Sequence, residues 1–342
     1  MKIKNRISLL LKILSLATVF ALVLPFAGKS VLAAEKGSKG DFEYEYEGKR
    51  LTITNYTGFD DVVEIPKTID GKNVVAIGRG AFEKSKNLTK VTIPEGVILL
   101  DFHAFFECKN LTDVSMPSTL KVIGYEAFGS CESLEQITIP KNVRTIGGHA
   151  FSYCTSLKSI TIPTKANNLD SAIFSHCESL EKAVIKSRTK SLPGNTFWGC
   201  YSLKELELPE TVRFIRGSSL GCCNSLTKVT FPDSVYEVGG CFWDCNSLTT
   251  VVFGKNTLSI GYEMFGSCKN LRYLVIPSSV QKFDDGIFSR YYGDVSAITV
   301  ITTEGSKAEK WAKANGLAVS YDIDDLDNLE GEEYEEEEWD EE

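Results

Sequence analysis

Hydrophobic and polar positions in the middle of this chain repeat with a period of 23 residues. The clearest marker is a bulky apolar residue that recurs ten times, with eight of the nine spacings at 23 residues and one at 22. This column consists of Phe82, Phe105, Phe128, Phe151, Phe174, Phe197, Leu220, Phe242, Phe265 and Phe288. In eight of the repeats a Cys follows three residues later, at Cys108, Cys131, Cys154, Cys177, Cys200, Cys223, Cys245 and Cys268. So many in-phase copies indicate a solenoid in which each repeat forms one coil.

The unit Ile139–Thr161 shows how each coil is expected to be built. Alternation of apolar and polar residues near its end predicts a short strand with Ile160 facing the core and Thr161 facing solvent. The Pro that follows such a strand cannot donate a ladder hydrogen bond and ends it. A Val-x-x-Ile-Gly segment gives a second short strand, and we expect its Gly147 to form the corner through its backbone freedom. No unit buries its apolar edge alone, so stacking creates one continuous core.

Both ends of the repeat array carry sequences that predict caps. Phe42–Tyr46 and Leu51–Asn55 flank a short Gly-containing turn and predict a β-hairpin over the first coil. At the other end, Ser306 and Glu309 form a capping box that opens a short helix ending near Asn315, and a strand follows. Such caps cover the otherwise exposed end strands of a solenoid.

The repeats and caps together resemble the BspA-like bacterial leucine-rich repeat family, over about residues 41–321. The resemblance rests on the 23-residue copies, on Asn55-Tyr56-Thr57-Gly58 before Ile65-Pro66, and on Gly305-Ser306 before Ala312–Gly316. It implies a β-rich leucine-rich-repeat solenoid, wound as a right-handed superhelix of about ten 23-residue coils. It also implies a surface or secreted binding protein of a host-associated microbe.

Two segments depart from the consensus of the repeat. Ala166–Asp170 and Lys186–Leu192 replace the Val-x-x-Ile-Gly pattern in the fifth and sixth units. The sequence leaves two interpretations open, a local irregularity or a recognition site.

The two ends of the chain have compositions unlike that of the repeats. Residues 1–34 combine five cations, no anion, a long apolar run and the small residues Ala33-Ala34, which predicts a secretory signal peptide. An uncleaved membrane anchor is the alternative. Residues 322–342 carry 14 acidic groups and no cation, which predicts a disordered tail rather than a calcium loop. The expected organisation is therefore a signal peptide (1–34), a capping hairpin (35–64), repeats (65–303), a helix–strand cap (304–321) and an acidic tail (322–342).

Charge and motifs exclude several classes of function. The chain has a net charge of −9, while residues 35–321 carry 32 basic and 32 acidic side chains, so we expect no nucleic-acid partner. The three His residues and the Cys residues lack zinc-site spacing, and no phosphate-binding or nucleophile motif is present. We therefore expect no catalytic residues, no metal and no cofactor. Because eight of the ten Cys share one interior column, we expect free, buried thiols, with Cys222 the most exposed; cross-linking within the column is the alternative.

Two candidate binding surfaces follow from the phase of the repeat. Solvent-facing positions of the strand become apolar toward the C-terminal repeats, at Val252, Tyr273 and Val275, with Lys228 beside them. The second candidate is a ridge after the Phe column, where Trp198 and Trp243 share one phase with Phe106. Exposed aromatic residues anchor many interfaces, although packing between coils also explains the Trp pair.

These patterns predict an exported, monomeric, non-catalytic binding protein. Its expected ligand is a protein, such as an extracellular or surface protein of a host, and no membrane contact is expected once the signal peptide is removed. The alternative function is a structural or envelope-shielding surface protein with no defined ligand.

Overall fold

The computed structural model of the protein describes residues 34–288 and 295–322. Almost all of the predicted signal peptide and residues 323–342 of the predicted acidic tail lie outside the described residues. The fold described below belongs to one compact unit, which begins at Lys36.

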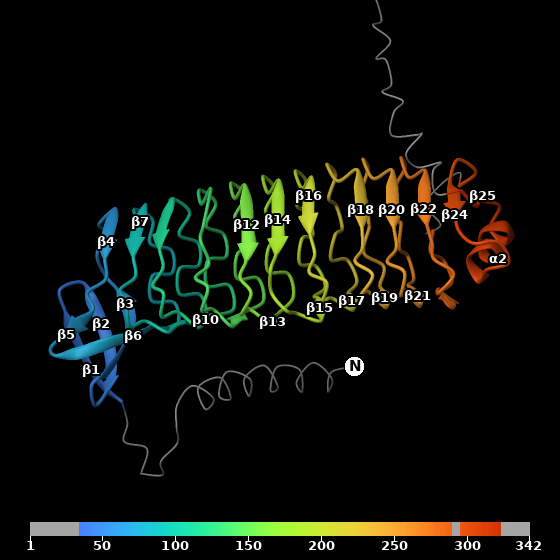
Figure 1. Cartoon of the computed structure of the whole chain (residues 1–342). Coiled ribbons are helices and arrows are strands. Elements are labelled where there is room, and N and C mark those ends of the chain that lie inside the picture. The colour runs from blue at the N-terminus through green and yellow to red at the C-terminus, as the bar shows by residue number, and fades with distance from the viewer. Residues whose placement is uncertain (1–33, 289–294, 323–342) are drawn as a thin grey trace, which may run out of the picture. The chain divides into compact units, whose positions relative to one another are not determined.

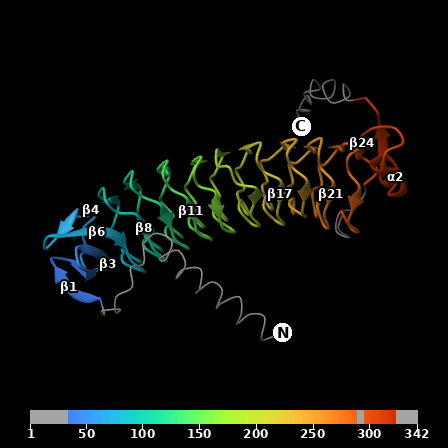
Figure 2. The ribbon, with the colours of Figure 1, turned by 60° about the horizontal axis from the view of Figure 1, so that its bottom comes forward.

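The repeats form a β-solenoid of about twelve coils of about 23 residues each, which confirms the predicted fold class. Two rows of short strands run along the stacked coils, as Figures 1 and 2 show. The first row, here the strand face, consists of β4 (Val62–Glu64), β7 (Lys90–Thr92), β9 (Asp113–Ser115), β12 (Ser159–Ile162), β14 (Lys182–Ile185), β16 (Glu205–Glu207), β18 (Lys228–Thr230), β20 (Thr250–Val252), β22 (Tyr273–Val275), β24 (Thr299–Ile301) and β25 (Ala318–Ser320). The row has eleven strands, and an isolated bridge between Gln136 and Ser159 marks one further coil between β9 and β12. The coils exceed the expected ten because the row extends into both caps, through β4 at one end and β25 at the other.

The second row comes from the Val-x-x-Ile segments. It consists of β6 (Lys72–Ile77), β8 (Leu99–Leu100), β10 (Val122–Ile123), β11 (Thr145–Ile146), β13 (Asn168–Leu169), β15 (Ser191–Leu192), β17 (Phe214–Ile215), β19 (Glu237–Val238), β21 (Ser259–Ile260) and β23 (Lys282–Phe283). Neighbouring strands are parallel, and most pair a residue with its equivalent 23 positions later, as Thr145 does with Asn168. The ladder is interrupted between β13 and β15, where the fifth and sixth units depart from the consensus.

The core is a stack of equivalent side chains from successive coils. The Phe rings from Phe82 to Phe197 lie nearly face to face, with centroids 4.9–5.7 Å apart. Each Cys of the column donates its S–H to a backbone carbonyl in the Phe column of the preceding coil, at 3.0–3.3 Å. The Cys therefore fills a small apolar space and also supplies a hydrogen-bond donor.

Glycine has a different role in the coils from the one the sequence suggested. The expected corner at Gly147 does not have a positive φ; a Cβ there would lie 2.6 Å from the backbone nitrogen of Tyr125 in the preceding coil. Close approach between coils therefore explains this glycine. The left-handed turns fall on side-chain-bearing residues instead, including His149 (φ 55°) and Tyr153 (φ 58°).

The N-terminal end of the solenoid is closed by an antiparallel hairpin at the predicted place. Strands β2 (Phe42–Glu47) and β3 (Arg50–Tyr56) pair with each other, and β3 continues in parallel to β6. Two further strands, β1 (Glu35–Lys39) and β5 (Thr68–Ile69), complete this end of the sheet. The ring of Tyr56 stacks on Phe82 at 5.0 Å, so the hairpin extends the aromatic stack of the core.

The C-terminal end is closed by helix α2 (Lys307–Ala314) and strand β25. Ala308 and Ala312 on this helix are fully buried. The ring of Trp311 stacks on Phe283 at 4.6 Å and lies 6.1 Å from Phe288. The stack of aromatic residues is thus covered by a ring from each cap.

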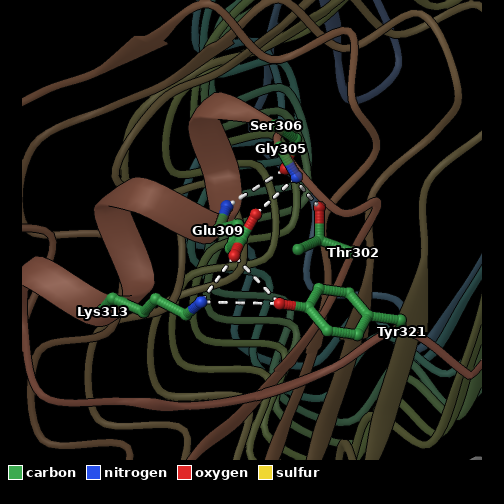
Figure 3. A network of polar contacts seen from close by, with 6 residues as sticks. All are labelled: Thr302, Gly305, Ser306, Glu309, Lys313 and Tyr321. Atoms are coloured by element: carbon green, nitrogen blue, oxygen red, sulfur yellow. Dashed lines mark hydrogen bonds and ion pairs between the residues drawn. The ribbon is translucent and has the colours of Figure 1, made fainter.

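A polar network fixes helix α2 at its first turn (Figure 3). Ser306 accepts a hydrogen bond from the backbone N–H of Glu309 at 3.1 Å, and the Glu309 carboxylate accepts one from the N–H of Gly305 at 2.5 Å. Lys313 and Tyr321 donate to the same carboxylate at 2.5 and 2.9 Å. The hydrogen bonds from Lys313, Tyr321 and Gly305 lower the pKa of Glu309 to about 2, so it remains charged near neutral pH.

We predict that Ile160→Asp prevents stable folding of the coils whereas Thr161→Asp is tolerated. Ile160 is 3% exposed and its neighbour Thr161 lies on the solvent side of β12. A carboxylate at Ile160 would be buried without a partner, at a cost of several kcal/mol in the free energy of unfolding. Thermal melting of the two variants measures the difference. Equal destabilisation of the two variants would contradict the observation that Ile160 faces the core and Thr161 faces solvent.

Candidate binding surfaces

The strand face carries charged side chains that pair from one coil to the next. Lys90 pairs with Asp113, and Lys158 with Glu135, both at 2.7 Å. Lys182 pairs with Glu205 in the next coil. The pKa of each of these lysines is raised by its carboxylate partner. Because each partner is 23 residues away, the repeat itself neutralises this part of the strand face.

The strand face becomes less polar toward the C-terminal coils. Tyr273, Val252 and Val275 lie on β20 and β22 and are all half-buried, so the structure brings these three predicted residues together. Val275 pairs in register with Ile301, which is only 3% exposed. The accessible part of this apolar patch is therefore limited to Val252, Tyr273 and Val275.

Two polar residues adjoin the apolar patch. Lys228 is exposed and lies in register with Thr250, which in turn lies in register with Tyr273. Thr250 occupies the same strand position as the solvent-facing Lys228 and Tyr273, but it is only 7% exposed. It is flanked by the two longer side chains of Lys228 and Tyr273 in the adjoining coils.

The predicted tryptophan ridge is built by packing between coils. Trp198 and Trp243 are half-buried, and each ring lies against a glycine of the following coil. A Cβ on Gly221 would lie 2.2 Å from the ring of Trp198, and a Cβ on Gly266 the same distance from Trp243. The packing of a large ring on a glycine 23 positions later explains why a Trp stands at the first position and a Gly at the second. It also supports the packing interpretation of the ridge.

Among the three His residues, His103 is the one placed between two carboxylates. His103 lies 2.6 Å from Glu126 and 3.6 Å from Glu83, whereas His149 and His176 lie in other coils. Among the described residues, no group of three His, Cys, Asp or Glu side chains could hold a metal ion. His103 is also stacked between the rings of Phe102 and Phe106, at 3.9 and 4.2 Å. Its contacts are those of a side chain packed between coils.

The cysteines are free thiols, as the sequence predicts. All except Cys222 are buried, and Cys222 is half-buried. Burial raises the pKa of Cys108 and of Cys154 to about 12, and it raises the pKa of the other Cys residues in the first six coils of the column as well. Thiols held in the neutral form are poor nucleophiles and poor metal ligands.

The segments that depart from the consensus line two adjoining hollows. The first has a volume of about 570 Å³ and is lined by Arg144, Thr164, Lys165, Asn167, Asn168 and Arg188. The second, of about 220 Å³, is lined by Arg188, Lys190, Glu210, Thr211, Arg213, Ser234 and Tyr236. Sequence reasoning noted the departures but not the cationic residues that they group with neighbouring coils. The signal that could have revealed these cations is that Arg144, Lys190 and Arg213 recur at multiples of 23 residues close to the second row of strands.

Membership of a family follows from comparison with known sequences. The sequence model of the BspA type leucine rich repeat region, with six copies, matches residues 75–201 and 167–293. The chain belongs to the BspA-type leucine-rich repeat family. No curated protein matches it significantly. Among the described residues of this BspA-type protein, no helix has the length and apolar character needed to span a membrane.

Several solved structures of bacterial leucine-rich repeat proteins are similar to this BspA-type chain. A leucine rich cell surface protein from Faecalibacterium prausnitzii is 23% identical, with 86% of this chain and 100% of that chain covered and a TM-score of 0.47. The leucine-rich repeat protein of T. pallidum is 24% identical, with coverages of 69% and 91% and a TM-score of 0.42. A protein from Bacteroides ovatus is 21% identical, with coverages of 78% and 100% and a TM-score of 0.44.

We predict that Gly221→Ala destabilises this BspA-type solenoid by about 1–3 kcal/mol, because the added methyl group overlaps the ring of Trp198. The matched control is Gly217→Ala, where the nearest atom to a Cβ is 3.7 Å away. Urea unfolding measures both variants. Replacing Trp198 by Ala in the Gly221→Ala background should remove the overlap, and a control that loses as much stability as Gly221→Ala would contradict the packing interpretation.

Proposed function

We propose that the chain is an exported, monomeric, non-catalytic binding protein that engages a protein ligand through the C-terminal part of its strand face. Membership of a leucine-rich repeat family supports a protein-interaction module. The observation that carries the choice of surface is the apolar patch of Val252, Tyr273 and Val275, which differs from the ion-paired lysines and carboxylates nearer the N-terminal end of the strand face.

The patch has the properties of an interface anchor. Its side chains are held on adjacent strands of a parallel ladder, about 4.8 Å apart, so little conformational entropy is lost on binding. The aromatic residue at its centre is of a type enriched at binding hot spots. Lys228, two coils from Tyr273, adds a cation at the rim. Affinity would come chiefly from removing the three apolar side chains from water.

Export and surface location belong to the same proposal. The basic and apolar pattern of residues 1–34 supports secretion, and membership of the BspA-type family supports a surface or secreted location. The expected ligand is therefore an extracellular or surface protein. No cofactor and no metal are required for this role.

We predict that Tyr273→Ala weakens binding to such a ligand by about 1–2 kcal/mol and leaves the melting temperature nearly unchanged. Binding of the purified chain to a panel of immobilised extracellular matrix proteins provides the measurement. Lys90→Ala is the control, because Lys90 lies on the same face in a distant coil and pairs with Asp113. Equal losses in both variants would exclude this patch. Retention of the chain by none of the matrix proteins would favour the shielding function instead.

A further inference from the structure

The two hollows beside β13 and β15 differ from the strand face in how their charges are arranged. On the strand face, lysines pair with carboxylates 23 residues away, and Lys109 and Glu132 pair in the same way nearby. In the described part of the chain, by contrast, no carboxylate lies within 4 Å of Arg144, Arg188, Lys190 or Arg213. The cations of the hollows therefore lack the carboxylate partner that the paired lysines of the strand face have.

The two hollows adjoin at Arg188, which lines both of them, and together they are here called the trough. The lining residues come from successive coils between Arg144 and Tyr236, and neighbouring coils lie about 4.8 Å apart. The cations therefore recur along a line at distances that suit a linear ligand with repeated negative charges. Glu210 is the one acidic residue among the described side chains that line the trough.

The ladder of backbone hydrogen bonds in the second row breaks between β13 and β15, beside the trough. The N–H of Arg188 donates to the side-chain oxygen of Asn167 at 2.9 Å, so a side chain takes the place of a strand partner at this point. Ser187 and Thr189 are buried on either side, which turns Arg188 outward between them. The departure from the repeat consensus thus presents a cation at the junction of the two hollows.

The neutral groups in the trough narrow the chemistry of the ligand. Hydroxyl and amide side chains alternate with the cations, including Thr164, Asn168 and Thr211. Tyr236 is exposed at one end, with the guanidinium of Arg213 placed 5.3 Å from the centre of its ring. Hydroxyl and amide groups suit sugar hydroxyls, and an exposed ring suits the apolar face of a sugar. Single-stranded nucleic acid would require several stacking rings, and Tyr236 is the only aromatic side chain among the described residues lining the trough.

We propose that this trough binds a linear anionic polysaccharide, with Arg144, Lys165, Arg188, Lys190 and Arg213 contacting its carboxylate or sulfate groups. The trough and the apolar patch of the strand face share no residues, so this site is independent of the proposed protein-binding function. The equal numbers of acidic and basic side chains in residues 35–321 do not exclude such a site, because cations can still be concentrated locally.

The test measures binding of the full chain to immobilised heparin, as the sulfated probe, and to polygalacturonate, as the carboxylate probe, at 0.15 M salt. We expect binding to at least one of the two, none to neutral dextran, and weaker binding to single-stranded DNA. Affinity should fall as salt rises, because bound counterions are released. The triple variant Arg144→Gln/Arg188→Gln/Arg213→Gln should lose roughly tenfold or more in affinity, since three exposed charge contacts are removed.

The matched control is Lys90→Gln/Lys158→Gln/Lys204→Gln, which removes the same charge from three exposed lysines that pair with acidic residues. This control should change affinity less than about twofold, and both triple variants should melt at the wild-type temperature. Tyr273→Ala should bind the polysaccharide normally, which separates failure of this proposal from failure of the protein-binding one. The proposal is overturned by no binding to either acidic probe, by equal losses in the two triple variants, or by equal affinity for single-stranded DNA.

Discussion

The spacing of the parallel strands governs every other feature of this molecule. Coils about 4.8 Å apart place each side chain directly against its equivalent in the next coil, so a residue is acceptable only if its neighbour 23 positions away allows it. The nearly parallel Phe rings satisfy this condition by stacking, and Tyr56 and Trp311 continue the stack into the caps. Trp198 satisfies it only because Gly221 leaves room for its ring.

The fold was predictable from the sequence because this constraint produces a pattern that repeats every 23 residues. The inward phase of Ile160, the hairpin at Phe42–Tyr56 and the capping box of Ser306 and Glu309 all follow from local residue patterns. The reason for Gly147 did not follow, because close approach depends on the backbone of the preceding coil. Burial of Thr250 was missed for a similar reason, since it depends on the longer side chains in register on either side.

The candidate sites were less predictable than the fold. The apolar patch around Tyr273 could be found because strand positions facing solvent are identified by phase alone. The cations of the trough also share columns of the repeat, Arg144 with Lys190 and Arg213, and Lys165 with Arg188, but their phase does not show whether a carboxylate lies beside them. Whether a cation is paired depends on the side chains of adjoining coils. The sequence marks the irregular segments, and the structure shows which charges they leave without a carboxylate.

The two candidate surfaces differ in how their charges are arranged. The strand face is a regular array in which charges cancel and a small apolar patch is left accessible. The trough lies beside the second row of strands, where the repeat is irregular and the charges do not cancel. The apolar patch is held by a backbone ladder that forms without any ligand, so binding there requires little reorganisation.

The thiol column gives the most direct test of the stacked-coil account. Each Cys in it must be small, buried and reduced, since its S–H donates to a carbonyl of the preceding coil and desolvation suppresses the thiolate. Titration with a thiol reagent, without reductant, measures this at once. The account predicts one accessible thiol in the native protein, Cys222, and ten after denaturation. Several reactive thiols in the native state, or almost none after denaturation, would contradict it.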